Sequence, residues 1–416
     1  MADQYSTLDD LDVKGKRVLV RADLNVPVRD SRITDTARID RQAPTIRQLA
    51  ERGARVIVLS HFGRPKGTRV PELSLKPIAP ALARTIRRTV AFGNDCIGDV
   101  AKAAVSKLKD GDVVLLENTR FHAGEEANDP DFARALAELG DLYVNDAFSA
   151  AHRAHGSTEG VAHILPSAAG RAMQDELFHL HRALDQPNRP VLAIIGGAKV
   201  STKIALIENL LKKVDILVMG GAMANTFLAA EGIDVGKSLY EADQLETAKR
   251  ISGLATETGS FLILPTDVVV AKVFETGAPH RTVPAREVAD DDMILDVGPD
   301  TIADFEQHLH TVNTLVWNGP VGAFETPPFD HGTMAIARLV AARTKAGGLL
   351  SVAGGGDTVS ALKHAGVAGG FSYVSTAGGA FLEWLEGREL PGVAALAASL
   401  GVARQGLPTS TGSHRV

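Results

Sequence analysis

Short apolar runs rich in β-branched residues alternate with amphipathic segments along almost the whole chain, and no other feature restricts the fold as strongly. Most of the runs are continuously apolar, which is typical of strands whose two faces are both covered. The segments between them, such as 39–52, 131–138 and 202–211, have the spacing of helices. Strands are predicted over residues 17–22, 56–60, 113–116, 142–145, 191–195, 216–219, 262–264, 314–317 and 349–353. This repeated strand–helix order predicts an α/β fold with parallel sheets.

The chain has 416 residues, which is long for one domain and sufficient for two. Residues 171–184 have the pattern of a helix, and a Pro-rich breaker cluster follows it. We therefore predict two doubly wound parallel-sheet domains, 1–170 and 191–403, joined by a linker helix and hinge over 171–190. Residues 404–416 are polar and contain Gly, Pro, Ser and Thr, so they are predicted to be a loose tail.

Composition argues against several classes of protein. Cys96 is the only cysteine, so no internal disulfide is expected and a reducing compartment is favoured. No apolar run approaches the roughly 20 residues that a membrane helix needs, and the acidic first residues are unlike a secretory signal. The net charge of −6 argues against binding of nucleic acid by bulk attraction. We expect a cytoplasmic enzyme that acts on small molecules and binds neither nucleic acid nor membranes.

In the first half of the chain, basic side chains follow four successive predicted strands. They occur in RADLNVPV (21–28), HFGRP (61–65), ENTRF (117–121) and DAFSAAHRAHG (146–156). Ligands of open α/β sheets bind beyond the carboxyl ends of the strands, and guanidinium groups there can hold carboxylate or phosphate oxygens. One such residue is explained equally well by a capped polar turn or a solvated arginine. Four in succession predict a polyanion site.

In the second half, glycine-rich turns follow the strands instead. They are GGAKVSTK (196–203), WNGPVGAFE (317–325) and GGGDT (354–358). Glycine lets backbone N–H groups approach a phosphate closely, and a helix N-terminus favours its negative charge. Asp357 could hold Mg²⁺ or one of its waters, and Glu325 could accept ribose hydroxyl groups. These turns predict a phosphate or nucleotide site.

The second half also carries a lysine pair and lacks two familiar nucleotide-binding fingerprints. Lys199 and Lys203 share a face if both are helical; the alternative is a solvated lysine pair. Segment 232–238 is one residue short of G-x-x-x-x-G-K-[ST] and follows a helical pattern, so we discount it as a P-loop. G-x-G-x-x-G is absent at 354–359 because position 359 is Val, which argues against an NAD-dependent dehydrogenase.

Taken together, these segments resemble the motifs of the phosphoglycerate kinase family. The segments that match these motifs occur in the family's order: RADLNVPV, HFGRP, ENTRF, DAFSAAHRAHGS, GGAKVSTK, WNGPVGAFE, GGGDTVSAL and STAGGAFLEWLEG. The resemblance covers about residues 9–400. It implies two Rossmann-like domains, with glycerate bound by the N-terminal one and nucleotide by the C-terminal one. We also expect the last segment to return to the N-terminal domain. The implied activity is a glycolytic one, performed by a monomer with Mg²⁺: reversible phosphoryl transfer between 1,3-bisphosphoglycerate and ADP, giving 3-phosphoglycerate and ATP.

The resemblance also implies three groups of site residues. The substrate-binding group is Asp23, Leu24, Asn25, Arg38, His61, Phe62, Gly63, Arg64, Arg120 and Arg153. The nucleotide-binding group is Gly197, Ala198, Lys203, Gly220, Asn318, Pro320, Gly322, Glu325, Gly355, Gly356, Asp357 and Thr358, of which Asp357 also holds the metal. The catalytic group that faces the transferring phosphoryl is Arg38, Lys199 and Lys203. The attacking carboxylate is already ionised, so no general base is expected, and His61 is expected to bind an anion rather than shuttle a proton.

Three residues depart from the family's pattern. Ala377 stands where the first of three glycines is usual, and Phe381 stands where a small residue is usual. These two put in doubt how that loop flexes on closure. Arg171 occupies a place near the linker where the family is usually apolar.

The motifs for the two substrates lie on opposite sides of the predicted linker, so neither half alone completes the site. We expect an open form without substrates and a closed form with both, hinged near 170–190 and near 375–379, because direct transfer must exclude water. The rival is a non-catalytic anion- or nucleotide-binding protein with the same fold. Loss of Lys203 or Asp357 would favour that rival, but both residues are present.

Overall fold

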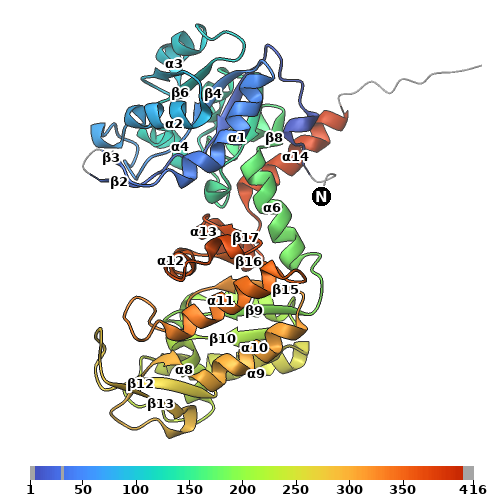
Figure 1. Ribbon diagram of the computed structural model, residues 1–416. Helices are drawn as coiled ribbons and strands as arrows, with labels where there is room; N and C mark the ends of the chain where they lie inside the picture. The colour runs from blue at the N-terminus through green and yellow to red at the C-terminus, as the bar shows by residue number, and fades with distance from the viewer. Residues whose placement is uncertain (1–4, 30–31, 406–416) are drawn as a thin grey trace, which may run out of the picture. The chain divides into compact units, whose positions relative to one another are not determined.

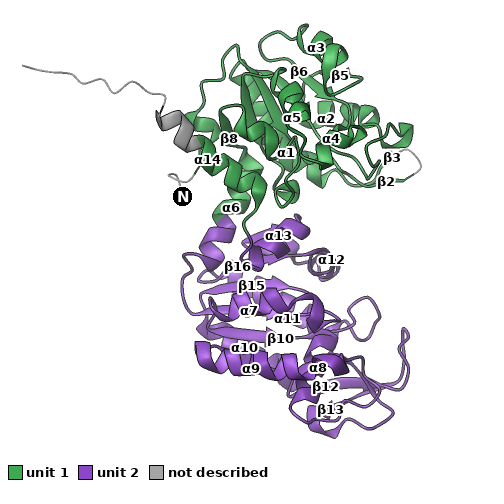
Figure 2. Cartoon of the chain, turned by 180° about the vertical axis from the view of Figure 1, so that it is seen from behind, with its two compact units in different colours: residues 1–178, 389–416 green, residues 179–388 purple. Residues whose placement is uncertain are grey.

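The computed structural model describes residues 5–29 and 32–405, which form two compact units (Figure 2). Unit 1 runs to Phe178 and resumes at Glu389, and unit 2 is His179–Arg388. The division between the units falls inside α6 (Arg171–Leu184). The resumed part of unit 1 contains α14 (Pro391–Gln405), so this helix takes in the start of the predicted tail. The rest of the tail, 406–416, lies outside the described residues.

Unit 1 is built on a six-stranded parallel sheet in the order β5-β6-β4-β1-β7-β8. Figure 1 labels β4, β6 and β8 of this sheet. Its strands are β1 (Arg17–Arg21), β4 (Arg55–Leu59), β5 (Val90–Gly93), β6 (Val113–Leu116), β7 (Leu142–Asn145) and β8 (Ser167–Ala169). Its helices before α6 are α1 (Ala37–Glu51), α2 (Ala79–Ile86), α3 (Gly98–Val105), α4 (Ala123–Glu126) and α5 (Pro130–Ala137). Along β1, Val18 and Val20 pack in one apolar cluster with Ile39 of α1, whereas Leu19 packs in another with Leu136 of α5. Both faces of the sheet are therefore covered, which explains why the strands are continuously apolar.

Unit 2 contains a second six-stranded parallel sheet, in the order β11-β10-β9-β15-β16-β17. Its strands are β9 (Val191–Ile195), β10 (Ile216–Met219), β11 (Phe261–Ile263), β15 (Thr314–Asn318), β16 (Leu350–Gly354) and β17 (Tyr373–Ser375). Its helices after α6 are α7 (Ile204–Leu211), α8 (Gly221–Ala230), α9 (Leu245–Thr258), α10 (Pro299–Thr311), α11 (His331–Lys345), α12 (Gly356–His364) and α13 (Gly379–Leu385).

Each sheet has one point where the strand order reverses. In unit 2 the chain moves from β9 toward one edge through β10 and β11, and then returns to the other side of β9 with β15. In unit 1 it moves from β1 to β4 on one side and later places β7 on the other. Ligands of doubly wound sheets bind at the carboxyl ends of the strands beside such a switch point. The fold thus indicates one binding edge in each unit.

A three-stranded antiparallel sheet in unit 2, with the order β13-β12-β14, was not predicted. It consists of β12 (Asp267–Ala271), β13 (His280–Pro284) and β14 (Met293–Val297). Its small apolar cluster joins Val268 and Val270 to Leu228 of α8. The strand β13 gave no apolar signal because four of its five residues are exposed.

The predicted α/β fold with two parallel-sheet domains is confirmed. All nine predicted strands are present, with ends that differ by at most one residue. Of the other strands, β5 is only partly buried and β8 consists of small residues, so neither presents a long apolar run. A short hairpin of β2 (Val28–Arg29) and β3 (Arg32–Ile33) was also missed.

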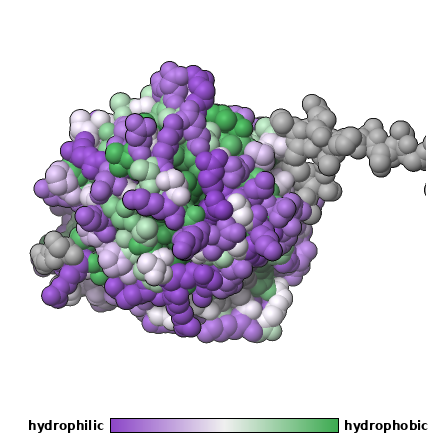
Figure 3. Space-filling view, turned by 90° about the horizontal axis from the view of Figure 1, so that it is seen from above, coloured by the Kyte–Doolittle hydropathy of each residue, from purple (hydrophilic) through white to green (hydrophobic). Residues whose placement is uncertain are grey.

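Figure 3 shows one face of the molecule, which is predominantly hydrophilic with smaller hydrophobic areas between the polar side chains. Within the described part of the chain, no helix combines the length and the apolar character that crossing a membrane requires.

Candidate active site

The predicted substrate-binding residues follow the carboxyl ends of unit 1 strands. Asp23 and Asn25 come after β1, and His61 comes after β4. Arg120 lies in the 3-10 turn η4 (Thr119–Phe121) after β6, and Arg153 follows the turn η5 (Phe148–Ala150) after β7. The segments after β1 and β7 therefore flank the switch point of this sheet.

His61 is held as a neutral hydrogen-bond donor by Arg21. Arg21, the last residue of β1, is fully buried, and its Nη2 lies 2.9 Å from His61 Nδ1. Because a guanidinium has only donors, Nδ1 must accept and the ring proton is on Nε2. Burial, followed by the positive charges of Arg21 and its neighbouring arginines, holds the pKa of His61 well below its ordinary value. His61 can therefore donate from Nε2 without carrying charge.

Asp23 positions Arg38. Arg38 Nη1 donates to Asp23 Oδ2 at 2.7 Å, and Ser149 Oγ donates to the same oxygen at 2.6 Å. Asp23 Oδ1 accepts the backbone N–H of Asn25 at 3.1 Å. The Asp23 side chain is 8% exposed and that of Arg38 is 35% exposed. Most Arg38 donors thus remain open to an anion, whereas both Asp23 oxygens already have protein partners.

The backbone of Gly63 connects its own turn to the turns that carry Asn25 and Arg120 by hydrogen bonds. Its N–H donates to Asn25 Oδ1 at 3.0 Å, and its carbonyl accepts from Arg120 Nη1 at 2.9 Å. Its φ is +60°, and a Cβ there would lie 2.7 Å from Leu73 Cδ2. Only glycine meets both conditions without strain. The backbone conformation therefore requires glycine at residue 63, and the two polar contacts fix where it lies.

Positive charge is crowded around Arg120. The side chain is almost fully buried, and its Nε lies 3.3 Å from Glu126 Oε1. Burial, together with the charges of Arg21 and Arg153, nevertheless lowers the pKa of Arg120 to about 10. Burial and the same group of arginines lower the pKa of His155 to about 3. A bound polyanion would relieve this repulsion, which marks the cluster as a candidate anion site.

The remaining predicted substrate residues have different placements. Leu24 is fully buried, and its N–H donates to Ser60 Oγ at 3.0 Å. Phe62 has its N–H and its carbonyl bound to the Asn118 side chain, at 3.2 and 2.7 Å. Arg64 is exposed. The first two therefore build the turns, and only Arg64 projects freely.

A buried hydrogen-bond network that was not predicted holds the side chain of Arg21 in place. Arg21 Nε donates to Ser157 Oγ at 2.8 Å, and that hydroxyl donates to Glu125 Oε1 at 2.5 Å. Glu125 also accepts from Ser157 N at 2.8 Å and from Thr119 Oγ1 at 3.1 Å. Glu125 and Ser157 are both fully buried. Nothing in the sequence separates Glu125 from the acidic residue beside it, because only the fold buries it.

In unit 2, Lys203 lies between the turn η7 (Val200–Thr202) and α7, after the switch-point strand β9. Its Nζ donates to the Gly196 carbonyl and to Asn318 Oδ1, each at 2.7 Å. An ammonium has three donors, so one remains for a ligand. Burial lowers the pKa of Lys203 to about 8, although the charge of Asp357 raises it.

Lys199 and Lys203 do not belong to one helix, so the condition for a shared helical face is not met. Lys199 has an extended backbone with φ −133° and ψ 123°, and its side chain is exposed. The turn η7 separates it from Lys203, whose own φ of −131° is also outside the helical range. Lys203 is therefore held by protein groups, whereas Lys199 is open to solvent.

A pocket of about 670 Å³ opens at this edge of unit 2. The predicted nucleotide residues that line it are Gly197, Ala198, Pro320, Gly322, Glu325 and Asp357. Its unpredicted apolar wall includes Leu239, Tyr240, Phe274, Met293 and Leu295. Apolar walls beside a few convergent polar groups are typical of a small-molecule site. The wall residues come from segments without a motif, so no local signal could have found them.

Other predicted nucleotide residues lie behind the pocket wall. Asn318 Nδ2 donates to the Gly354 carbonyl at 2.8 Å, and Thr358 Oγ1 accepts the N–H of Gly319 at 2.7 Å. Gly355 has φ +98°, and a Cβ there would approach Asn318 Nδ2 to 2.5 Å. These residues therefore fix the strand-to-helix turn that carries Gly356 and Asp357. Gly220 is not in the wall either, although its neighbour Gly221 is.

The segment discounted as a P-loop also reaches this pocket. Lys237 and Ser238 line it, and Ser238 Oγ accepts the N–H of Ile294 at 2.8 Å. The segment is a loop after α8 rather than a strand-to-helix turn, so it does not have P-loop geometry.

Asp357 meets the requirements of a Mg²⁺ ligand. It is the second residue of α12, it is exposed, and it lines the pocket. Within residues 5–29 and 32–405, no hydrogen bond or ion pair engages its carboxylate. Mg²⁺ prefers such hard oxygen ligands together with waters and phosphate oxygens.

The residues at the three departures from the resemblance make the following local contacts. Phe381 is fully buried, and its Cδ1 would lie 2.6 Å from a Cβ on Gly354, so its ring covers the end of β16. The N–H of Ala377 donates to Ser375 Oγ at 3.2 Å. Arg171 Nη1 donates to Asp9 Oδ2 and its Nε donates to Gln48 Oε1, both at 2.8 Å. Arg171 thus ties the start of α6 to the N-terminal segment and to α1.

Comparison with known proteins gives one consistent result. The family model for phosphoglycerate kinase matches residues 8–388. The phosphoglycerate kinase of Rhodospirillum centenum is 62% identical over 394 residues, which is 95% of this chain and 100% of that protein. That of Rhizobium meliloti is 62% identical over 390 residues, which is 94% of this chain and 98% of that protein.

Solved structures agree with these sequence matches. The structure of phosphoglycerate kinase from Coxiella burnetii is similar with a TM-score of 0.89 and 42% identity, covering 95% of this chain and 99% of that one. The enzyme from Pyrococcus horikoshii gives a TM-score of 0.79 at 30% identity over the same shares of the two chains.

Proposed function

The chain belongs to the phosphoglycerate kinase family, and we infer from its geometry how its own residues carry out that family's reaction. The protein is a glycolytic kinase that transfers a phosphoryl group reversibly between 1,3-bisphosphoglycerate and ADP, giving 3-phosphoglycerate and ATP. The roles of individual residues, the metal, the compartment and the oligomeric state are our proposals.

We propose that the cluster of unit 1 binds 3-phosphoglycerate. Arg120, Arg153 and the exposed Arg64 would neutralise its phosphate and carboxylate. His61 would donate from Nε2 as a neutral group, since Arg21 occupies Nδ1. The Asn25 amide group would contact the same substrate, because only its carbonyl oxygen is used by Gly63. The crowding of positive charge around Arg120 supports this assignment.

We propose that the nucleotide occupies the pocket of unit 2, with its ring between the apolar walls and its phosphates toward the glycine turns. Lys203 would direct its third donor at the transferring phosphoryl, and Arg38 would reach that group from the glycerate side. The exposed Lys199 would neutralise the phosphate tail. The substrate carboxylate is ionised at neutral pH, so positioning and charge neutralisation suffice and no side chain has to remove a proton.

Asp357 would hold Mg²⁺, which when bound neutralises phosphate charge on the nucleotide. Glu325 lines the same pocket and would accept hydroxyl groups of the ribose. The lone cysteine agrees with a reducing compartment, so we propose the cytoplasm, and we propose a monomer as the working form.

The observation that carries these assignments is that the arginine cluster and the nucleotide pocket belong to different compact units. Direct transfer then requires the units to close on their substrates. Small-angle scattering tests this: the radius of gyration should fall only when 3-phosphoglycerate and Mg-nucleotide are both bound. An unchanged radius at confirmed saturation would refute closure. A coupled assay on the same sample keeps that outcome distinct from an inactive preparation.

A further inference from the structure

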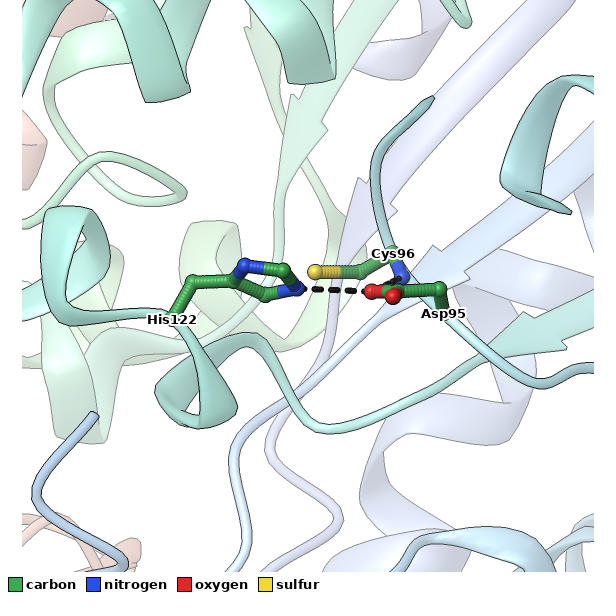
Figure 4. Close-up of side chains that lie close together, drawn as sticks. All are labelled: Asp95, Cys96 and His122. Carbon is green, nitrogen blue, oxygen red and sulfur yellow. Dashed lines mark hydrogen bonds and ion pairs between the residues drawn. The ribbon is translucent and has the colours of Figure 1, made fainter. Parts of the chain in front are cut away.

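One cluster of potential metal ligands lies outside the site described above. Asp95 and Cys96 are in the loop between β5 and α3, and His122 precedes α4. One carboxylate oxygen of Asp95, the Cys96 Sγ and a His122 ring nitrogen all lie within 4.8 Å of one another. Figure 4 shows the three side chains pointing toward a common centre. Two chain segments that are far apart in sequence thus place a carboxylate, a thiol and an imidazole together.

We propose that Asp95, Cys96 and His122 form a binding site for a Zn²⁺-type transition-metal ion with water at the fourth position. These are the three side-chain types that Zn²⁺ takes as ligands, and three protein ligands leave one open coordination position. A hard, oxygen-preferring ion such as Mg²⁺ gains little from sulfur and nitrogen donors. The donor set therefore selects a borderline or soft divalent ion.

The extent to which the three side chains are buried is suited to a transition-metal ion. The Cys96 side chain is fully buried, whereas Asp95 and His122 keep 30% and 29% of their side chains exposed. The thiol thus closes the inner side, and the other two ligands leave a route of entry from solvent. The His122 ring also packs against Phe132, with ring centroids 5.5 Å apart, which restricts its orientation.

The charges around the cluster are suited to a cation. The negative charges of Asp95, Glu125 and Glu117 all act on the Cys96 side chain. These negative charges disfavour a Cys96 thiolate that has no metal beside it, but they attract a divalent cation to the same position. Arg69 opposes this attraction, because its Nη2 lies 3.9 Å from Asp95 Oδ2. Its Nη1 also lies 3.9 Å from Glu117 Oε2. Arg69 is more than half exposed, so solvent screens its charge more than the charges of the buried Glu117 and Glu125.

Without a metal, His122 Nε2 and Asp95 Oδ1 form a hydrogen bond of 2.6 Å. Metal binding would replace it. The Cys96 S–H bond breaks, its proton leaves to solvent and a sulfur–metal bond forms. The ring proton of His122 moves from Nε2 to Nδ1 through solvent, which frees the Nε2 lone pair for the metal. Thiolate and carboxylate together then balance the charge of a divalent ion.

The test uses Co²⁺ as the probe on the full-length protein, without a polyhistidine tag and after treatment with a chelator. Cys96 is the only cysteine, so a thiolate-to-cobalt absorption band in the near ultraviolet can come from no other residue. We expect one Co²⁺ per chain with this band, displacement by Zn²⁺, and no displacement by excess Mg²⁺. Absence of the band in folded protein at excess Co²⁺ would overturn the proposal, and the three side chains would then be a hydrogen-bonded group only.

Three variants and a control locate the ion. Cys96→Ser should abolish the band, and His122→Gln and Asp95→Asn should each weaken binding at least about tenfold. His163→Ala is the control, because His163 pairs with Glu159 at 2.7 Å in the same unit without a thiol nearby. Unchanged affinity in Cys96→Ser and His122→Gln would contradict the site. If a variant does not fold, the spectrum of the parent protein and its response to Zn²⁺ still decide the question.

Discussion

Replacement of Lys203 by methionine should separate catalysis from stability. The variant removes the donor that we assign to the transferring phosphoryl group, and loss of one such donor costs about 10²–10³-fold in kcat, or about 2.7–4 kcal/mol. We expect a much smaller change in the KM of either substrate. A coupled assay with 3-phosphoglycerate, ATP and Mg²⁺ measures both constants, and a near-normal kcat would refute the assignment.

The stability of this variant depends on two opposing effects. Burial lowers the pKa of Lys203 from 10.5 to about 8, so holding the charged amine at pH 7 costs about 3 kcal/mol, which methionine avoids. The Gly196 carbonyl and Asn318 Oδ1 lose their shared donor, and each such loss costs about 1–3 kcal/mol. The free energy of unfolding in urea should therefore change by less than about 3 kcal/mol.

The pH dependence of stability provides an independent test of the same lysine. Its pKa is lower in the folded protein than in the unfolded chain, so between about pH 8 and 10.5 the unfolded chain keeps a proton that the folded protein has lost. Stability rises with pH wherever the unfolded state binds more protons. The ligand-free parent should accordingly gain stability relative to Lys203→Met across this range. A constant difference would show that Lys203 is not buried as described.

Three further substitutions test the other assignments. Arg38→Ala should lower kcat by about 10²–10³-fold while changing either KM far less, and equal losses in both constants would contradict a role in transfer. Asp357→Asn should weaken Mg-nucleotide binding in calorimetry and leave 3-phosphoglycerate binding almost intact, whereas equal losses for both ligands would indicate a folding defect. Glu125→Gln places an amide where three donors converge, so it should lower the free energy of unfolding by about 1–3 kcal/mol and raise the KM for 3-phosphoglycerate only. A normal KM in that last variant would show that the Glu125 network does not position Arg21.

The parallel sheets could be predicted because most of their strands bury both faces and therefore appear as uninterrupted apolar runs. The strand Val191–Ile195 is an example, since all five of its residues are buried. Strand β13 escaped because four of its five residues are exposed and most of them are polar. Strand β12 was missed although four of its five residues are buried, so exposure explains β13 but not β12.

The candidate site was only partly predictable. Segments such as 61–65 are contiguous in sequence, and the succession of four such segments after predicted strands indicated anion binding. The pocket wall is different, because Tyr240 and Met293 meet only after folding. Glu125 is similar, since its burial depends on Ser157 and Thr119 arriving from other segments. Lys199 and Lys203 were expected to share a face only if both were helical, and the spacing alone could not show that a 3-10 turn separates them.

Unit 1 is discontinuous in sequence, because α14 belongs to it although all of unit 2 lies between. In α14, Ala395 joins the apolar cluster of Leu136 and Val161, and the Gly392 N–H donates to the Ala151 carbonyl at 2.9 Å. During synthesis, the contiguous residues of unit 2 have therefore all left the ribosome before unit 1 receives its last helix. A chain that stops at Arg388 would contain every residue assigned to catalysis and still lack part of the scaffold under the glycerate site. The glycerate-binding unit therefore cannot be completed until the segment that follows unit 2 has been synthesised.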